Sequence, residues 1–315
     1  MALVFSGLTV TGGISFTPPP PPPSYKAIFG YGITSTATAI TNLVSNTGVV
    51  ATDTAGVGTA RYKLAASVYG TDKAIFGYGT TTATPTAVSV TNLVSNTGVV
   101  ATDTTGVGTA RYSLAAAGYG TDKAIFGFGS TTTDTTVVST TNLVSNTGVV
   151  GNDVTGVGSA RYGVAGTGYG SSGQAIFGYG HIPFNGASSL TNLVSNTGVV
   201  ASDVTSANPP APYRAAARYG TDKALFGFGA GGPLNDINLI SNTGVVATST
   251  SGVGTARYSL AAASYGVDTA IFGYGYTSTY VSMTNLVSNT GVLATDTTGV
   301  GTARYSLAAA SYGLA

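Results

Sequence analysis

Apolar residues in this chain occur in short runs that are separated by glycine and by small polar residues. The run AIFGYG is apolar and aromatic and is closed by glycines, so it is too short for a helix and too rich in Phe, Tyr and Ile for a loop. The phrases TNLVSN and GVVATD combine β-branched residues with a break at Asn-Thr-Gly, which predicts a hairpin because Asn and Gly tolerate positive φ. The phrase RYSLAAASYG contains Leu and Ala, which favour a helix, but the glycines that flank it favour a strand. Together these patterns predict four short strands.

The same phrases recur six times along the chain. TNLVSNTGVV stands unchanged at residues 41–50, 91–100, 141–150 and 191–200, and it returns with small changes at residues 237–246 and 284–293. Residues 26–313 comprise 288 positions, which divide into six units of 48. Four-stranded units of this length are typical of propeller blades. The sequence therefore predicts an all-β fold, a six-bladed β-propeller over residues 26–315.

The order of the phrases predicts how such a ring closes. The repeated region opens with AIFGYG at residues 27–32 and finishes with ARYSLAAASYG at residues 303–313. If the Ala-rich phrase forms the first strand of each blade, the C-terminal strand has no blade of its own and must complete the N-terminal one. A ring closed in this way leaves no free sheet edge.

With this organisation the unit resembles the kelch repeat, in which an arginine opens an inner strand of small residues and a second strand ends in a glycine pair. The matching residues are Arg304, Ala308 and Ala309, followed around the ring by residues 29–32 (FGYG). The glycine pair of the family stands here as Gly-Tyr-Gly or Gly-Phe-Gly, and the usual Trp is absent. The resemblance covers about nine-tenths of the chain. It implies a propeller fold of the kind seen in phage virion appendages, and it implies no particular activity.

A different composition precedes the repeats. Residues 1–16 alternate apolar with small polar residues and predict one or two strands, with apolar positions at Leu3, Phe5, Leu8, Val10, Ile14 and Phe16. Residues 17–25 contain six consecutive prolines, which predict a stiff polyproline II linker on the order of 19 Å long. A disordered tail and a linear Pro-rich ligand are the alternatives. We favour a docking segment that pairs with another chain, because alternating apolar residues are a poor composition for disorder.

Composition limits the classes of partner. Charged residues make up 7% of the chain, against about 25% in an ordinary soluble domain, and twelve Lys and Arg balance eleven Asp. There is no basic field for nucleic acid, and no apolar window long enough for membrane insertion. Cysteine is absent, and the N-terminus does not resemble a secretory signal, so these features do not identify the cellular compartment of the protein. A virion protein, made in the cytosol and then exposed on a particle surface, fits both observations.

Length variation is concentrated in one connection of the unit. The interval from the phenylalanine of AIFG to the asparagine of TNLV ranges from 12 to 16 residues, whereas the interval from that asparagine to the arginine position is always 19. In an antiparallel blade the variable connection joins the second strand to the third. We therefore expect all six variable inserts on one face of the disc, where loops on a rigid scaffold commonly bind ligands.

The repeated arginines have two interpretations. They could form a ring of guanidinium groups facing a central channel, or each could pair with the aspartate eight residues earlier. We favour structural ion pairs, because a group present in nearly every unit is part of how units are built. The expected pairs are Asp53 with Arg61, Asp103 with Arg111, Asp153 with Arg161, and Asp296 with Arg304. In the fourth unit Ala211 takes the arginine position and Arg214 follows three residues later. A single aspartate per loop is too few ligands for calcium, so we expect no metal.

The residues found in one unit alone are candidates for ligand binding. His181, the single histidine, lies in the fourth insert beside Phe184 and Asn185, and Tyr280 lies in the last insert. With one histidine, no cysteine and no glutamate, a zinc site or a catalytic triad is disfavoured. Aromatic residues of this kind stack on sugar rings.

The sequence thus predicts a non-enzymatic protein without cofactors, and most simply a bacteriophage virion component such as a tail fibre, receptor-binding or decoration protein. Residues 1–16 would bind other virion proteins, and the variable inserts would meet the host surface, for example a host-surface glycan. The alternatives are an extracellular lectin-like propeller and a cytoplasmic kelch-type adaptor that captures a peptide in its channel.

Overall fold

The computed structural model describes residues 24–82 and 86–313, and within these residues the fold is all-β, with seven small antiparallel sheets and no helix. The expected docking segment, residues 1–16, and nearly all of the proline linker lie outside the described residues.

Six of the sheets repeat one pattern. In each, a central strand that carries the AIFG phrase pairs with an Ala-rich strand on one side and with a strand of the TNLV phrase on the other. The central strands are β1 (Lys26–Gly30), β4 (Lys73–Gly77), β7 (Lys123–Gly127), β10 (Gln174–Gly178), β16 (Lys223–Gly229) and β19 (Thr269–Gly273). The Ala-rich strands are β21 (Ala308–Tyr312), β3 (Ala65–Tyr69), β6 (Ala115–Tyr119), β9 (Ala165–Tyr169), β15 (Ala215–Tyr219) and β18 (Ala261–Tyr265). The TNLV strands are β2 (Thr41–Val44), β5 (Thr91–Val94), β8 (Thr141–Val144), β13 (Leu190–Val194), β17 (Leu234–Ile240) and β20 (Thr284–Val287). The Ala-rich phrase is therefore a strand, as its flanking glycines predict.

The outer part of each unit departs from the predicted fourth strand. Among the described residues β14 (Val204–Thr205) is the only outer strand, and it pairs with β13. In the other units the outer segment touches the TNLV strand through isolated bridges, as Val50 does with Val44 and Thr54 with Thr41. Between these bridges the Asn42 side chain donates 3.0 Å to the carbonyl of Ala51. A side chain thus occupies an acceptor that a continuous strand would use.

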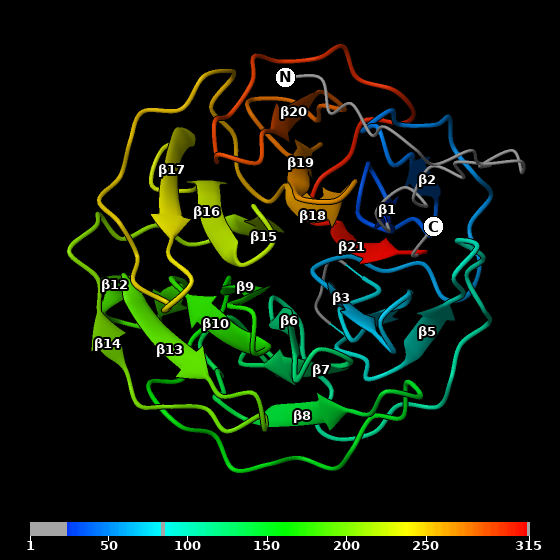
Figure 1. Ribbon diagram of the computed structural model, residues 1–315. Helices are drawn as coiled ribbons and strands as arrows, with labels where there is room; N and C mark the ends of the chain where they lie inside the picture. Colours follow the sequence, from blue (N-terminus) through cyan, green and yellow to red (C-terminus); the bar gives the residue numbers. More distant parts are fainter. Residues whose placement is uncertain (1–23, 83–85, 314–315) are drawn as a thin grey trace, which may run out of the picture.

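The sheets lie around a common centre, with the Ala-rich strands nearest to it and the TNLV strands farther out (Figure 1). Neighbouring sheets pack face to face through the central strands. The Phe76 ring of β4 meets the Tyr31 ring of the adjacent unit edge-on, with centroids 5.1 Å apart. Gly30 makes room for this ring, because a Cβ there would lie 2.7 Å from Cζ of Phe76. The arrangement is compatible with a β-propeller.

The two ends of the repeated region meet in one sheet. Strand β21 pairs antiparallel with β1, with Lys26 opposite Tyr312 and Gly30 opposite Ala308. This is the pairing that the order of the phrases predicts.

A cyclic series of six backbone hydrogen bonds links the units near the centre. Each member is the residue two positions after the arginine position, has positive φ, and donates its N–H to the equivalent carbonyl of a neighbouring unit. The bonds run from Ser113 to Lys63, Gly163 to Ser113, Tyr213 to Gly163, Ser259 to Tyr213, Ser306 to Ser259, and Lys63 to Ser306, with N···O distances from 2.8 to 3.3 Å.

Candidate functional site

The repeated arginines are buried between the sheets and do not face the centre. Arg61 is fully buried, and its Nη2 donates 2.6 Å to Oδ1 of Asn92. Its Nε donates a hydrogen bond of 2.8 Å to the carbonyl of Tyr78, and its Nη1 donates one of 3.0 Å to the carbonyl of Thr59. The guanidinium lies 4.3 Å above the centroid of the Tyr31 ring. Each of the three guanidinium nitrogens has an acceptor in the scaffold and the side chain is fully buried, so these arginines are unavailable to a ligand.

The expected pairing of Asp53 with Arg61 is wrong. The carboxylate nearest to Arg61 belongs to Asp103, 3.9 Å from its Nη1. Asp53 instead accepts hydrogen bonds from the backbone and hydroxyl of Thr302 and from Asn42. The chain passes from one sheet to the next between Asp53 and Arg61, so their side chains serve different sheets.

The other three expected pairs are corrected in the same way. The observed neighbours are Asp103 with Arg61, Asp153 with Thr109 beside Arg111, Asp203 with Arg161 at 3.6 Å, and Asp296 with Arg257 at 3.7 Å. Arg304 likewise lies near Asp53: burial raises the pKa of this carboxyl, but hydrogen bonds from Thr302 and Asn42, together with the charge of Arg304, lower it by more.

The fourth unit restores the arginine site from a different position. Arg214 lies 4.5 Å above the Tyr179 ring, as Arg61 lies above Tyr31, and its Nη2 donates 2.8 Å to Oδ2 of Asp236. The unit that lacks the arginine in sequence therefore still places a buried guanidinium over an aromatic ring.

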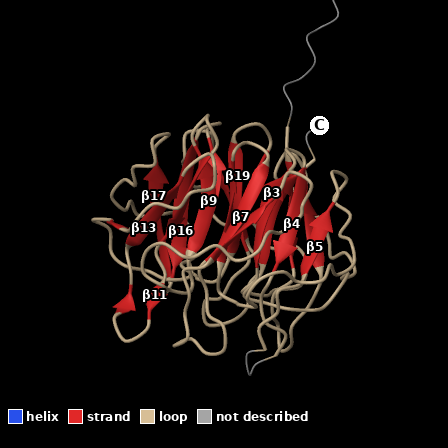
Figure 2. Ribbon diagram, turned by 90° about the horizontal axis from the view of Figure 1, so that it is seen from below, coloured by secondary structure: helices blue, strands red, loops and turns tan. Residues whose placement is uncertain are grey.

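The variable inserts start beside the segments that lead into the Ala-rich strands, as the bridges of Tyr62 with Thr80 and of Tyr162 with His181 show. The described chain ends lie by the opposite ends of those strands, where Tyr25 bridges Gly266 and the N–H of Gly313 donates to the carbonyl of Asp72. Figure 2 shows this separation, with β11 of the fourth insert at the lower face and the C-terminal end at the upper face.

The candidate binding residues fall into two separate groups. In the fourth insert, β11 (His181–Ile182) and β12 (Gly186–Ala187) form a hairpin whose tip carries Phe184, 93% exposed, and Asn185. The His181 ring lies 5.1 Å from that of Tyr162. Tyr280 lies in another unit, with the sheet of β15, β16 and β17 between the two. The four residues therefore do not form one site.

Tyr280 belongs to a cluster that sequence reasoning missed. Its ring stacks on Tyr305 with centroids 5.3 Å and planes 13° apart, and Tyr276 and Tyr258 complete the cluster. Tyr305 and Tyr258 directly follow repeated arginines, so they resemble scaffold residues in the sequence. The signal available was the insert YTSTY, which contributes two further tyrosines at the same place.

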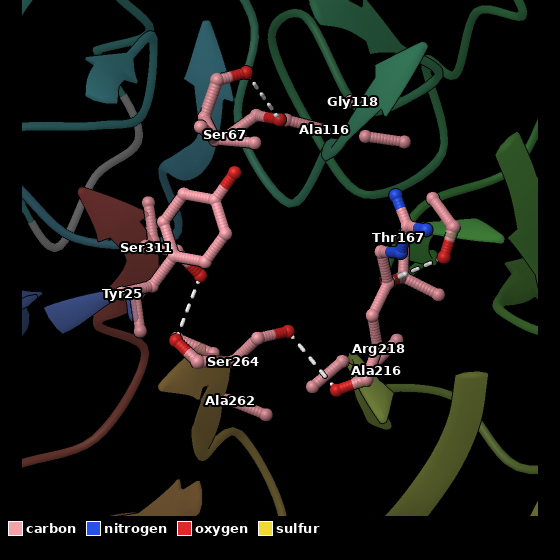
Figure 3. Close-up of a pocket in the computed structure, with 18 of the residues that line it drawn as sticks. Tyr25, Ser67, Ala116, Gly118, Thr167, Ala216, Arg218, Ala262, Ser264 and Ser311 are labelled. Carbon is pink, nitrogen blue, oxygen red and sulfur yellow. Dashed lines mark hydrogen bonds between the residues drawn. The ribbon is translucent and has the colours of Figure 1, made fainter. Parts of the chain in front are cut away.

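A cavity of about 310 Å³ lies at the centre, between the Ala-rich strands. Small residues form most of its wall, and Arg218 and Tyr25 lie on opposite sides of it (Figure 3). Tyr119, Lys123 and Tyr219 are further large polar residues that line it. Sequence reasoning missed Arg218 as well. It is the single charged residue within the six Ala-rich strands β3, β6, β9, β15, β18 and β21, and that was the signal available.

No group of three His, Cys, Asp or Glu side chains that could hold a metal occurs in residues 24–82 and 86–313. The described part of the chain also has no helix with the length and apolarity that a membrane span requires. Comparison with protein-family models found no match, and comparison with curated protein sequences found none either.

Proposed function

We propose that the chain is a non-enzymatic recognition protein built as a closed, six-bladed propeller of the kelch type. The pairing of β1 with β21 and the cyclic series of six hydrogen bonds from Lys63 to Ser306 support closure. A closed ring holds its inserts rigidly, which reduces the entropy lost when they bind a partner.

The observation that carries the proposal is the separation of chain ends and variable inserts on opposite faces (Figure 2). A protein anchored through its N-terminal segment would then present all its variable loops away from the anchor. Together with the neutral surface and the near-identical units, this favours an appendage of a bacteriophage virion, with residues 1–16 bound to other virion proteins.

Mass spectrometry of purified particles tests this role directly. We expect the full chain at a fixed ratio to known virion proteins across density-gradient fractions. A variant that lacks residues 1–23 should be expressed and folded but missing from the particles. Incorporation of this variant at the normal ratio would show that the N-terminal segment is not the anchor.

Glycan binding by the inserts is a second candidate, favoured by the exposed Phe184 ring and by the tyrosine cluster around Tyr280. Aromatic side chains provide flat apolar surfaces of the kind that pack against sugar rings. On a glycan array we expect Phe184→Ala to abolish binding to the fourth insert, Tyr280→Ala to abolish binding to the last insert, and His181→Ala to weaken binding to the fourth insert. Val199→Ala is the matched control, because Val199 is 66% exposed in the same unit as Phe184 but lies in the turn at the opposite end of β13. Equal binding by all four variants would exclude the inserts as the glycan site.

A further inference from the structure

One residue in the wall of the central cavity differs in charge from its equivalents in the other units. The fourth residue of each Ala-rich strand is neutral in five units and charged in one, and these residues are Val68, Gly118, Gly168, Arg218, Ser264 and Ser311. Residues that recur in every unit are explained by the scaffold. A single arginine in the wall of a cavity requires a separate explanation, because placing a charge out of water is unfavourable unless it finds a partner.

The scaffold satisfies only part of the Arg218 guanidinium. Its Nη2 donates a hydrogen bond of 2.7 Å to the carbonyl of Thr221 and one of 3.3 Å to the carbonyl of Gly170. Its Nε and Nη1 have no acceptor among the described residues, and no carboxylate there forms an ion pair with it. Burial lowers the pKa of Arg218, while Tyr25 and Asp222 act in the opposite direction. The Nε and Nη1 donors of a planar cation are thus left for an anion, and hydrogen bonds from a charged donor to a carboxylate are stronger than those between neutral groups.

Tyr25 faces Arg218 from the other side of the cavity (Figure 3). Its backbone is fixed by two hydrogen bonds with Gly266, of 2.7 and 2.8 Å. Burial raises the pKa of Tyr25, so its hydroxyl stays protonated at neutral pH and can act as a donor. This hydroxyl has no acceptor among the residues that the structure describes. Two donors therefore point into one cavity from opposite walls.

The rest of the cavity wall limits the polar groups and the size of the ligand. The Ser264 hydroxyl donates a hydrogen bond of 3.0 Å to the carbonyl of Arg218. The Ser311 hydroxyl donates one of 2.8 Å to the carbonyl of Ser264. Their protons are used, so these oxygens remain as acceptors for ligand hydroxyl groups. Small side chains such as Ala216 and Ala262 form the surface between the polar groups. A cavity of about 310 Å³ is at the lower end of the range for small-molecule sites.

We propose that this cavity binds a small hydroxylated carboxylate, such as a uronic acid. The carboxylate would lie between Arg218 and Tyr25, and hydroxyl groups of the ligand would donate to Ser264 and Ser311. Arg218 is the lining cation without an ion pair among the described residues, and Asp268 adds a carboxylate to the wall, so the cavity matches one negative charge at most. A phosphate dianion would leave excess negative charge, because Lys123, the other cation in the wall, already pairs with Asp122 at 3.1 Å. The site lies on the face of the chain ends, so it is independent of recognition by the inserts.

Isothermal titration calorimetry of the full chain tests the proposal with four probes: glucuronate, propionate, glucose and inorganic phosphate. We expect glucuronate to bind, propionate to bind more weakly because it lacks hydroxyl donors, and glucose and phosphate to bind at least about tenfold more weakly than glucuronate. No glucuronate binding up to about 10 mM would refute the proposal. Phosphate affinity equal to that of glucuronate would refute the assignment of a carboxylate.

Arg218→Ser is the decisive variant, since serine already stands at the equivalent position in two units, at Ser264 and Ser311. We expect it to keep the melting temperature and to lose glucuronate affinity by at least about tenfold. Lys223→Ser removes an exposed cation that does not line the cavity, and this variant should bind normally. Tyr25→Phe keeps the ring and removes the hydroxyl, so it provides a second test with a smaller loss. Unchanged affinity in both Arg218→Ser and Tyr25→Phe would overturn the site.

Discussion

The Nη2 of Arg304 donates a hydrogen bond of 2.8 Å to Oδ1 of Asn42, although 262 residues separate the two in the chain. Its Nε donates 2.8 Å to the carbonyl of Tyr31, and the guanidinium is fully buried. The same contacts join Arg61 to Asn92 and Tyr78 within an internal unit. The junction of the chain ends thus has the same arginine–asparagine contact as the four internal units that carry the repeated arginine.

Replacement of either arginine by alanine should therefore have the same consequence. Arg304→Ala and Arg61→Ala each leave buried acceptors without a donor, and we expect each to lower the free energy of unfolding by about 3 kcal/mol or more. Chemical denaturation at neutral pH measures both. A large loss for Arg61→Ala with no loss for Arg304→Ala would show that the ends do not pair in solution.

Packing between the sheets predicts that two glycines differ in the stability change that substitution by alanine causes. A Cβ on Gly178 would lie 2.6 Å from Cζ of Phe226, whereas a Cβ on Gly151 would meet nothing closer than the carbonyl of Leu143 at 3.4 Å. We expect Gly178→Ala to cost about 1–3 kcal/mol through overpacking. Gly151→Ala should be neutral or stabilise by about 0.4–1 kcal/mol, since other units carry alanine there.

Thermal and chemical unfolding of both glycine variants checks this prediction, and Phe226→Leu supplies a second control. In that background the ring that blocks the new methyl group is gone, so Gly178→Ala should cost less. An equal cost in both backgrounds would mean that the clash with Phe226 is not the cause.

The repeat made the scaffold predictable from the sequence. The period of the phrases defines six units, the glycines around the Ala-rich phrase identify it as a strand, and the order of the phrases pairs β21 with β1. The partner of each arginine was not predictable from spacing. Asp53 and Arg61 are close in sequence, but the chain changes sheet between them, and sequence distance does not report that change.

The candidate sites were less predictable, because they depend on exceptions to the repeat. Arg218 was visible as a charge within an Ala-rich phrase, but its role depends on how six strands converge on one cavity. The stacking of Tyr280 on Tyr305 depends on the conformation of an insert, which no periodicity encodes.

Removal of the last strand should destabilise the whole protein. A chain that ends at Thr302 lacks Arg304 and β21, so β1 becomes an exposed edge of the kind that pairs with other chains. We expect aggregation or a loss of cooperative unfolding, measured by light scattering and circular dichroism. A chain that ends at Gly313 is the matched control and should behave as the full chain. A monomeric, cooperatively folded product from the shorter chain would contradict this expectation.

Acid should destabilise the protein through a repeated carboxylate. Burial raises the pKa of Asp103, but the hydrogen bonds from Thr59 and Asn92 outweigh it, so its folded-state pKa lies below the unfolded value. The same holds for Asp53, Asp153, Asp203 and Asp296. A lowered pKa means that the stabilisation is present above the unfolded pKa of about 3.9 and is lost as the pH falls through the folded value. We expect constant stability above roughly pH 5 and a fall below about pH 4.

The fifth unit supplies the variant that tests this acid dependence. Ser249 stands at the aspartate position there, and its Oγ accepts a hydrogen bond of 2.9 Å from Asn238. Asp103→Ser should therefore fold, be less stable at pH 7, and lose less stability than the wild type between pH 5 and pH 3, because one titrating group is gone. Val99→Thr changes an exposed residue of the same unit and should keep the wild-type acid profile. Denaturation midpoints across this range decide the matter: parallel profiles for Asp103→Ser and the wild type would show that this carboxylate does not drive acid unfolding.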